Sequence, residues 1–148
     1  MRLRIIGCTG SMSGPDSPAS CYLLQALGPD ERTGRERTWN LVLDMGPGSF
    51  GELWRYIEPS NLDAVIFSHC HADHMGDVIS LHVYRRWGPG AYCDPMVLAG
   101  PACLPGRVRQ IDGAGEEEDY STEFIFKELS DTQTWDLGPF TVSAARAW

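Results

Sequence analysis

Residues 69–74 carry four side chains that can bind metal ions: His69, His71, Asp73 and His74. They use three of the four histidines in the chain. Imidazole and carboxylate groups are the ligands that zinc and related divalent ions prefer. A single histidine is most simply a surface residue, but this density at this spacing favours a shared site. The pattern therefore predicts a centre that binds divalent cations.

The position of this cluster supports the same interpretation. It follows Ala64–Phe67, an apolar run typical of a buried central strand. Ligands bind at strand ends in layered α/β proteins. If the segment stays extended, residues two apart share a side, so His69, His71 and Asp73 converge and His74 turns to the other flank. We expect this geometry to offer two ligands to one ion and two to a neighbouring ion.

The rest of the chain supplies the elements that must hold the cluster. Apolar runs predict short strands, and apolar residues spaced as on one helical face predict two helices. The expected strands are 3–7, 21–26, 39–43, 64–67, 96–99, 124–129 and 140–145, and the expected helices are 50–57 and 77–87. Residues 104–122 are expected to form a loop or a partly ordered helix. The fold class is therefore α/β or α+β with a mixed sheet.

Length and composition limit the function classes. The 148 residues suit a single domain, residues 1–148, and the net charge of −8 disfavours broad electrostatic capture of nucleic acid. A small phosphate ester remains possible, because bound metal ions supply local positive charge. Five scattered cysteines without CxxC spacing indicate reduced thiols and a cytoplasmic location. No apolar run approaches the roughly 20 residues that span a bilayer, so we expect no membrane segment.

Several motifs resemble those of one known family. The hexad 69–74, His-Cys-His-Ala-Asp-His, resembles the signature of the metallo-beta-lactamase superfamily. Residues 6–11 and 18–24 are similar to the first hairpin of its ribonuclease Z and cyclic-nucleotide phosphodiesterase branch. Residues 43–48 resemble the third-strand turn of that branch, and Gly76-Asp77 follows the hexad as it does there. The likeness covers most of residues 1–100.

This resemblance implies an αββα sandwich that holds two divalent metal ions, with zinc as the default and manganese or iron as alternatives. His69 and His71 would bind the first ion, and Asp73 and His74 the second. A hydroxide that bridges the ions would be the nucleophile, and the catalytic carboxylate Asp73 would also orient the attacking water. Asp44 would lie behind the ligands and fix the loop by hydrogen bonds.

The chain also departs from the family pattern. The family takes further ligands from residues downstream of the hexad, but His82 is the one histidine after His74 in this sequence. We therefore expect an αββα sandwich truncated to its N-terminal half, with too few ligands for two ions and one sheet face uncovered. A fragment, a homo-oligomer in which a second copy supplies the missing half, and a decayed half-protein all remain open.

The function expected from these features is metal-dependent hydrolysis. The branch resemblance predicts a phosphodiesterase that acts on cyclic nucleotide or RNA phosphodiesters, and the acidity of the chain favours the smaller substrate. A lactonase or thioesterase is the rival enzyme, because the same activated hydroxide serves acyl transfer. An inactive half-domain that acts through association is the non-enzymatic alternative.

Several weaker signals have simpler interpretations. Gly46–Gly51 matches Gly-x-Gly-x-x-Gly, but Asp44 precedes it, so a tight turn is favoured over a nucleotide cradle. His82 is expected to be solvated or at the edge of the core. Cys70 is expected to be a small packing residue. On the helices we expect buried tryptophans at positions 54 and 87 and a solvated face at 84–86.

Overall fold

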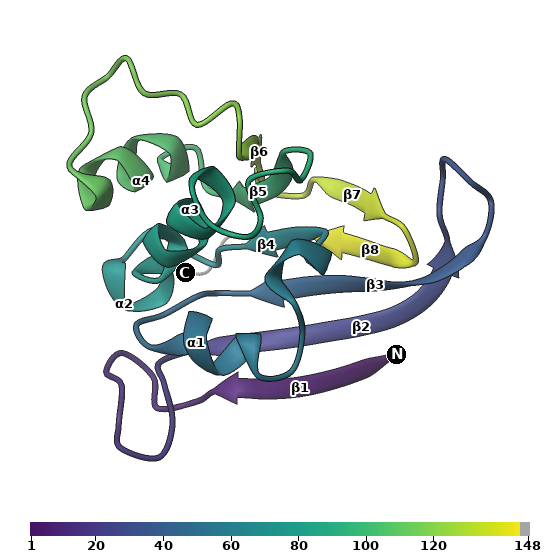
Figure 1. The fold of residues 1–148 in the computed structure, drawn as a ribbon, viewed down its shortest axis with the longest axis horizontal. Helices are drawn as coiled ribbons and strands as arrows, with labels where there is room; N and C mark the ends of the chain where they lie inside the picture. The colour runs from purple at the N-terminus through teal and green to yellow at the C-terminus, as the bar shows by residue number, and fades with distance from the viewer. Residues whose placement is uncertain (146–148) are drawn as a thin grey trace.

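The computed structural model of the chain describes residues 1–145, and a six-stranded mixed sheet forms its centre. The strands lie side by side in chain order (Figure 1). The first three pair antiparallel, and every later neighbour pairs parallel. The strands are β1 (Arg2–Gly7), β2 (Cys21–Pro29), β3 (Glu36–Leu43), β4 (Ala64–Ile66), β5 (Met96–Gly100) and β6 (Phe124–Glu128). The predicted mixed α/β fold is therefore confirmed.

Helices cover one face of this sheet. Side chains that alternate along the central strands, such as Val42, Val65 and Leu98, pack with helical residues such as Leu53 and Leu81 in the larger core cluster. The helical elements are α1 (Ser49–Trp54), η1 (Pro59–Asn61), α2 (Ala72–Met75), α3 (Val78–Arg86) and α4 (Leu104–Asp112). α4 gives a regular helix to residues for which a loop or a partly ordered helix was expected.

A small hairpin packs on the opposite face of the sheet. β7 (Thr134–Leu137) and β8 (Phe140–Ser143) form a separate antiparallel sheet. Phe140 packs with Trp39 and Leu41 in a second core cluster. β7 was not expected, since its short segment carries little apolar pattern. The hairpin leaves part of this face open: Leu3 and Ile5 at its edge are each 59% exposed.

Residues 84–86 on α3 were expected to form a solvated face, but two of the three are buried. Arg85 is 4% exposed and Tyr84 is also buried, so the predicted solvated face is wrong for both. Val78, Leu81, His82 and Arg85 follow helical spacing toward the core, which puts Arg85 on the buried stripe. Its guanidinium donates hydrogen bonds to the backbone carbonyls of Glu123 and Asp94. These carbonyls compensate the burial of the charge.

Two tryptophans expected in the core are exposed instead. Trp54 is 40% exposed and Trp87 is 69% exposed. Both lie at helix ends, Trp54 as the last residue of α1 and Trp87 just after α3, where the buried face of each helix has ended.

Among residues 1–145, no helix has the length and apolar character that a bilayer crossing requires.

His82 lies deep in the core, which corrects the expectation of a solvated or core-edge residue. It is 1% exposed, and its Nδ1 lies 3.1 Å from Oε1 of Glu123, whose side chain is fully buried. The same oxygen lies 2.9 Å from Nε of Arg86. Rings of Tyr120 and Trp87 flank the imidazole. This buried polar cluster ties α3 to the start of β6.

Candidate metal centre

The predicted metal-binding residues lie where β4 ends and α2 begins. β4 runs between two parallel neighbours and is buried along its whole length, as its apolar sequence predicts. The chain then turns outward through residues 67–71 and enters α2. His69 and His71 stand on this loop, and Asp73 lies in the first turn of the helix. The buried strand thus fixes the base of a loop whose side chains reach solvent.

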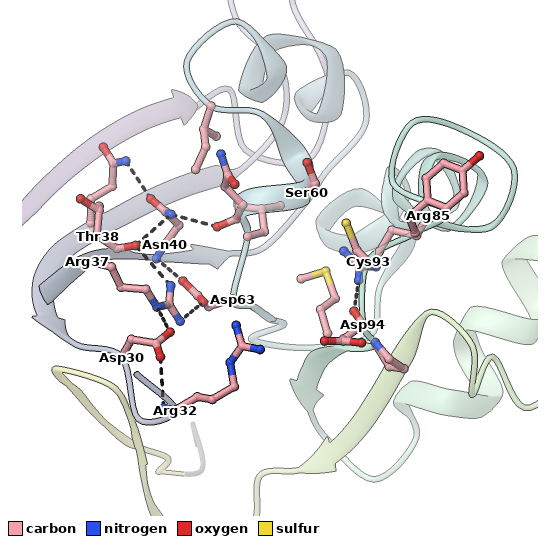
Figure 2. Close-up of a pocket in the computed structure, with 17 residues that line it drawn as sticks. Asp30, Arg32, Arg37, Thr38, Asn40, Ser60, Asp63, Arg85, Cys93 and Asp94 are labelled. Atoms are coloured by element: carbon pink, nitrogen blue, oxygen red, sulfur yellow. Dashed lines mark hydrogen bonds and ion pairs between the residues drawn. The ribbon is translucent and has the colours of Figure 1, made fainter. Parts of the chain in front are cut away.

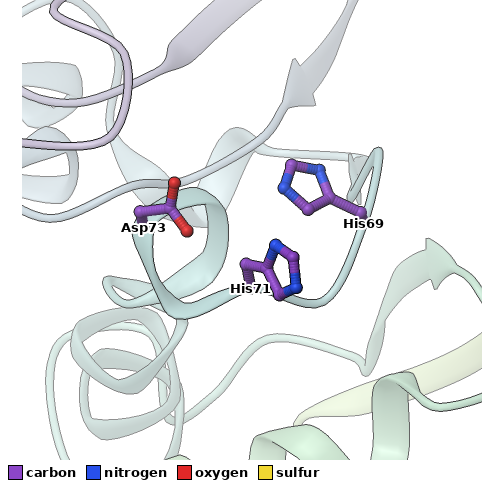
Figure 3. Close-up of side chains that lie close together, drawn as sticks. All are labelled: His69, His71 and Asp73. Atoms are coloured by element: carbon purple, nitrogen blue, oxygen red, sulfur yellow. The ribbon is translucent and has the colours of Figure 1, made fainter.

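Three potential ligands converge on one point. Figure 3 shows His69, His71 and Asp73 directed toward one another from the loop and the helix. One ligand atom of each lies within 4.8 Å of the other two. The His69 and His71 rings meet edge to face, with centroids 4.9 Å apart. An imidazole–imidazole–carboxylate set at this separation matches the chemistry of a zinc-type site.

The route to this convergence differs from the expected one. An extended segment was predicted through Asp73, but β4 ends at Ile66, the chain bends at residues 68 and 69, and His71 is already the N-cap of α2. Asp73 and His74 belong to the helix. The helical turn carries Asp73 back toward the histidines and keeps His74 beside them, so the four side chains gather without strand alternation.

His74 joins the group by way of Asp44. Its Nδ1 lies 2.7 Å from Oδ2 of Asp44, and its Nε2 lies 3.6 Å from Oδ2 of Asp73. Its ring centroid is 4.1 Å from that of His69. A carboxylate partner favours the proton on Nδ1, which leaves the Nε2 lone pair free toward the site. This is how metal-binding histidines are usually oriented.

Asp44 fastens the loop to the neighbouring strand. It follows β3, is 6% exposed and accepts hydrogen bonds from the backbone N–H of Ser68 at 2.8 Å and from the Ser68 hydroxyl. Its φ of 56° lies in the left-handed region, which aspartate tolerates better than most residues. The Ser68 hydroxyl also lies 2.9 Å from Nδ1 of His69. Ser68 is a positioning residue that the spacing of the histidines did not indicate.

The glycine-rich turn after Asp44 serves close packing. A Cβ at Gly46 would collide with the carbonyl oxygen of Asp73 and the side chain of Ala19. Gly48 has a φ of 83°, as a tight turn requires. Just before the turn, the backbone carbonyl of Met45 accepts a hydrogen bond from the Asp77 N–H, and the Met45 N–H donates to the His74 carbonyl. The tight-turn interpretation is therefore confirmed, and the glycines let this turn touch α2.

The electrostatics of the loop keep Asp73 ionised. A hydrogen bond from the Ser11 side chain holds the pKa of this carboxyl below its usual value, and His74 and His69 nearby lower it further. Ser11 comes from the loop between β1 and β2, so a third segment of the chain reaches the site. Sequence reasoning missed this contact, because Ser11 is remote from the hexad and has no distinctive pattern.

Cys70 packs against the core, as expected of a packing residue. It is half-buried and packs against the larger core cluster. Burial, followed by the neighbouring Cys103 thiol, raises the pKa of the Cys70 thiol to about 12. A neutral thiol is a poor metal ligand.

A pocket lies at the opposite end of the parallel strands from the metal-binding loop. It measures about 860 Å³ and includes Asp63 before β4 and Met96 at the start of β5 (Figure 2). One of its three arginines, Arg37, is paired with carboxylates, since it lies 2.6 Å from Asp63 and 3.2 Å from Asp30. The groove contains no histidine. The chemistry that the sequence predicts therefore belongs to the opposite edge of the sheet.

The sequence has relatives among known proteins. The uncharacterized protein Rv1339 of Mycobacterium tuberculosis (strain ATCC 25618 / H37Rv) is 36% identical over 144 residues, which make up 96% of this chain and 49% of that protein. The chain thus spans about half the length of this relative. The probable metallo-hydrolase YhfI of Bacillus subtilis (strain 168) is 30% identical over 88 residues, which make up 60% of this chain and 32% of that protein.

Solved structures share the fold. The crystal structure of YhfI, a metallo-beta-lactamase fold protein from Bacillus subtilis, has a TM-score of 0.70 at 24% identity and covers 94% of this chain and 50% of its own. A long form RNase Z from yeast has a TM-score of 0.66 at 17% identity, with 91% and 20% covered. The family model of the metallo-beta-lactamase superfamily matches residues 16–98, which include the turn after β3, the hexad and α3. This chain is a member of the metallo-beta-lactamase superfamily.

Proposed function

We propose that the chain carries the metal-binding part of a hydrolase that acts on phosphodiesters, with cyclic nucleotides or RNA as the substrate class. The observation that carries the proposal is the convergence of His69, His71 and Asp73, with His74 held beside them by Asp44. Membership of a superfamily that includes a probable metallo-hydrolase supports the reaction type.

The donor set fits divalent zinc, with manganese or iron as the alternatives. Three imidazoles and one carboxylate are ligands of the right hardness for these ions. The site is also accessible, because His71 is exposed and the side chain of Asp73 is 29% exposed. Two ions that each take three or four protein ligands need more than these four groups. We therefore expect further protein groups to complete the coordination of a two-metal site.

The residues of the metal-binding loop and its neighbours would have separate roles in metal binding and hydrolysis. Bound divalent ions supply Lewis acidity and bring the pKa of a coordinated water toward about 7. The carboxylate of Asp73, whose pKa lies below its usual value, would accept a hydrogen bond from the attacking water and orient it. Asp44 and Ser68 hold His74 and His69 in place, so the ligands need little reorganisation before binding.

The resemblance of residues 6–11, 18–24 and 43–48 to the ribonuclease Z branch, together with the likeness to RNase Z from yeast, supports a phosphodiester as the substrate class. The acidic chain, with a net charge of −8, favours a small substrate over a long nucleic acid. A lactonase or thioesterase activity is the competing outcome of the experiment below.

The test compares turnover of a 3′,5′-cyclic nucleotide, a short RNA and a lactone by the chain loaded with zinc or manganese. We expect phosphodiester cleavage that disappears on chelation and returns with metal. His71→Ala removes one exposed ligand without opening the core, so we expect it to abolish turnover and weaken zinc binding. Tyr92→Ala is the matched control, because it removes an aromatic ring that is 97% exposed and lies outside the metal-binding loop.

Two results would contradict the proposal. Full activity of His71→Ala would remove the assigned site, and cleavage of the lactone alone would assign the chain to acyl hydrolysis. If no substrate is cleaved but His71→Ala still lowers zinc affinity, the metal site stands and the proposed activity of this chain by itself is refuted.

A further inference from the structure

Two cysteine thiols meet beside the metal-binding loop. Cys70 stands between His69 and His71, and Cys103 is the N-cap of α4. β4 and β5 pair in parallel with Ile66 opposite Ala99, and each cysteine lies the same number of residues beyond its paired position. The two loops therefore leave the sheet side by side, and the Cys103 thiol lies close enough to help raise the pKa of the Cys70 thiol.

The backbone around this pair is fixed by contacts between the two loops. The N–H of Phe67 donates to the carbonyl of Ala99 at 2.8 Å. Arg107 on α4 donates from Nε to the Cys70 carbonyl at 3.0 Å. A Cβ at Gly100 would approach the Phe67 carbonyl oxygen to 3.2 Å, so glycine lets the loops lie this close. These contacts hold the two loops that carry the cysteines beside each other.

The two thiols differ in access. Cys103 is exposed, whereas Cys70 is half-buried and packs against the core. An oxidant in solution thus reaches Cys103 first and leaves Cys70 to react with the oxidised sulfur. An accessible cysteine beside a less accessible one can be oxidised first and then be resolved by its neighbour.

We propose that Cys70 and Cys103 form a reversible disulfide that reshapes the metal-binding loop, with a peroxide as the oxidant. The Cys103 sulfur displaces water from the peroxide as the O–O bond breaks and becomes a sulfenic acid. The Cys70 sulfur then attacks it: the S–S bond forms, the S–O bond breaks, and the oxygen leaves as a second water with the Cys70 proton. The two thiols lose two electrons, which reduce the peroxide.

The consequence for metal binding rests on the proposed function. Cys70 lies between two of the assigned ligands, so tying its side chain to α4 changes the directions of His69 and His71. Changes of this kind around a metal site typically cost 10-fold or more in affinity. We expect zinc affinity to fall by about 10-fold on oxidation and to return fully after reduction by dithiothreitol.

The experiment treats the metal-free chain with hydrogen peroxide, digests it without reduction and maps the linked peptides by mass spectrometry. We expect a Cys70–Cys103 crosslink in the wild type and in Cys93→Ser, a control that keeps the pair intact. Cys103→Ser should form no crosslink to Cys70. Zinc affinity is then measured on reduced and oxidised protein, with oxidised Cys103→Ser as the matched comparison.

Each result decides one part of the proposal. No Cys70–Cys103 peptide, or Cys103 linked mainly to another cysteine, overturns the disulfide. A crosslink with unchanged zinc affinity overturns the effect on the loop. Reduced protein that binds no zinc overturns the proposed metal site and this effect together, while the peptide map still decides the disulfide by itself.

Discussion

Replacing Asp44 by asparagine tests how the site is held together. Asp44 accepts from the backbone N–H of Ser68 at 2.8 Å through one oxygen and faces Nδ1 of His74 at 2.7 Å with the other. Both partners are donors when His74 keeps Nε2 free for metal. Asparagine has one carbonyl oxygen and one NH₂ group, so it cannot accept from both at once. Asparagine also tolerates the left-handed φ of 56°, which alanine would not.

The size of the effect follows from these contacts. If the amide oxygen stays with Ser68, the NH₂ group faces Nδ1 and forces the His74 proton to Nε2, where it blocks the metal. Loss of such an orienting carboxylate costs about 10- to 100-fold in metal affinity, or about 1.4–2.8 kcal/mol. The metal-free protein loses hydrogen bonds to a charged acceptor as well, so we expect its unfolding free energy to fall by about 2 kcal/mol.

The assay is a zinc titration against a chromophoric chelator, paired with urea unfolding of the metal-free protein. Glu116→Gln, which removes one carboxylate from an exposed loop, is the control for the change in net charge. Zinc affinity of Asp44→Asn equal to that of wild type, with the fold intact, would refute the orienting role of Asp44.

Three further predictions concern packing and ionisation. Glu123→Gln should lower the unfolding free energy in urea by about 3 kcal/mol, because it leaves the buried His82 without its carboxylate partner and removes one of the two carboxylates that pair with Arg86. No change would show that the cluster is not coupled to stability. Gly46→Ala should cost about 1–3 kcal/mol by the same assay, because its Cβ collides with the Asp73 carbonyl, and a neutral result would place that turn elsewhere. Burial raises the pKa of the Cys21 thiol from 9.0 to about 12. The neutral thiol therefore stabilises the fold below pH 9, and this contribution is lost as the pH rises toward 12. In native protein at about pH 8, Cys21 should resist a thiol reagent that labels the exposed Cys8. Equal labelling of the two thiols would contradict the burial of Cys21.

The sequence predicted those parts of the molecule that follow from local pattern. Ala64–Phe67 reads as a central strand because both of its faces are apolar, and its position between β3 and β5 confirms this. The hexad indicated a metal site because several metal-binding side chains are concentrated in one short segment. Both signals lie within a few consecutive residues.

The features that sequence reasoning missed depend on contacts between distant segments. Glu123 explains why His82 is buried, but the two meet only because β6 starts beneath α3. From the sequence, Arg85 is expected in solvent, but it is buried and donates to the backbone carbonyls of Asp94 before β5 and Glu123 before β6. Ser11 reaches Asp73 from another loop. A pattern along one segment cannot specify partners of this kind.

The most direct test of the account is X-ray absorption spectroscopy at the zinc edge on the reduced, zinc-loaded chain. We predict a first shell of nitrogen and oxygen atoms at about 2.0–2.2 Å with the outer scattering of imidazole rings, lost in part in His71→Ala. A shell of sulfur atoms at about 2.3 Å would assign the zinc to Cys70 and Cys103 and contradict the histidine–aspartate centre.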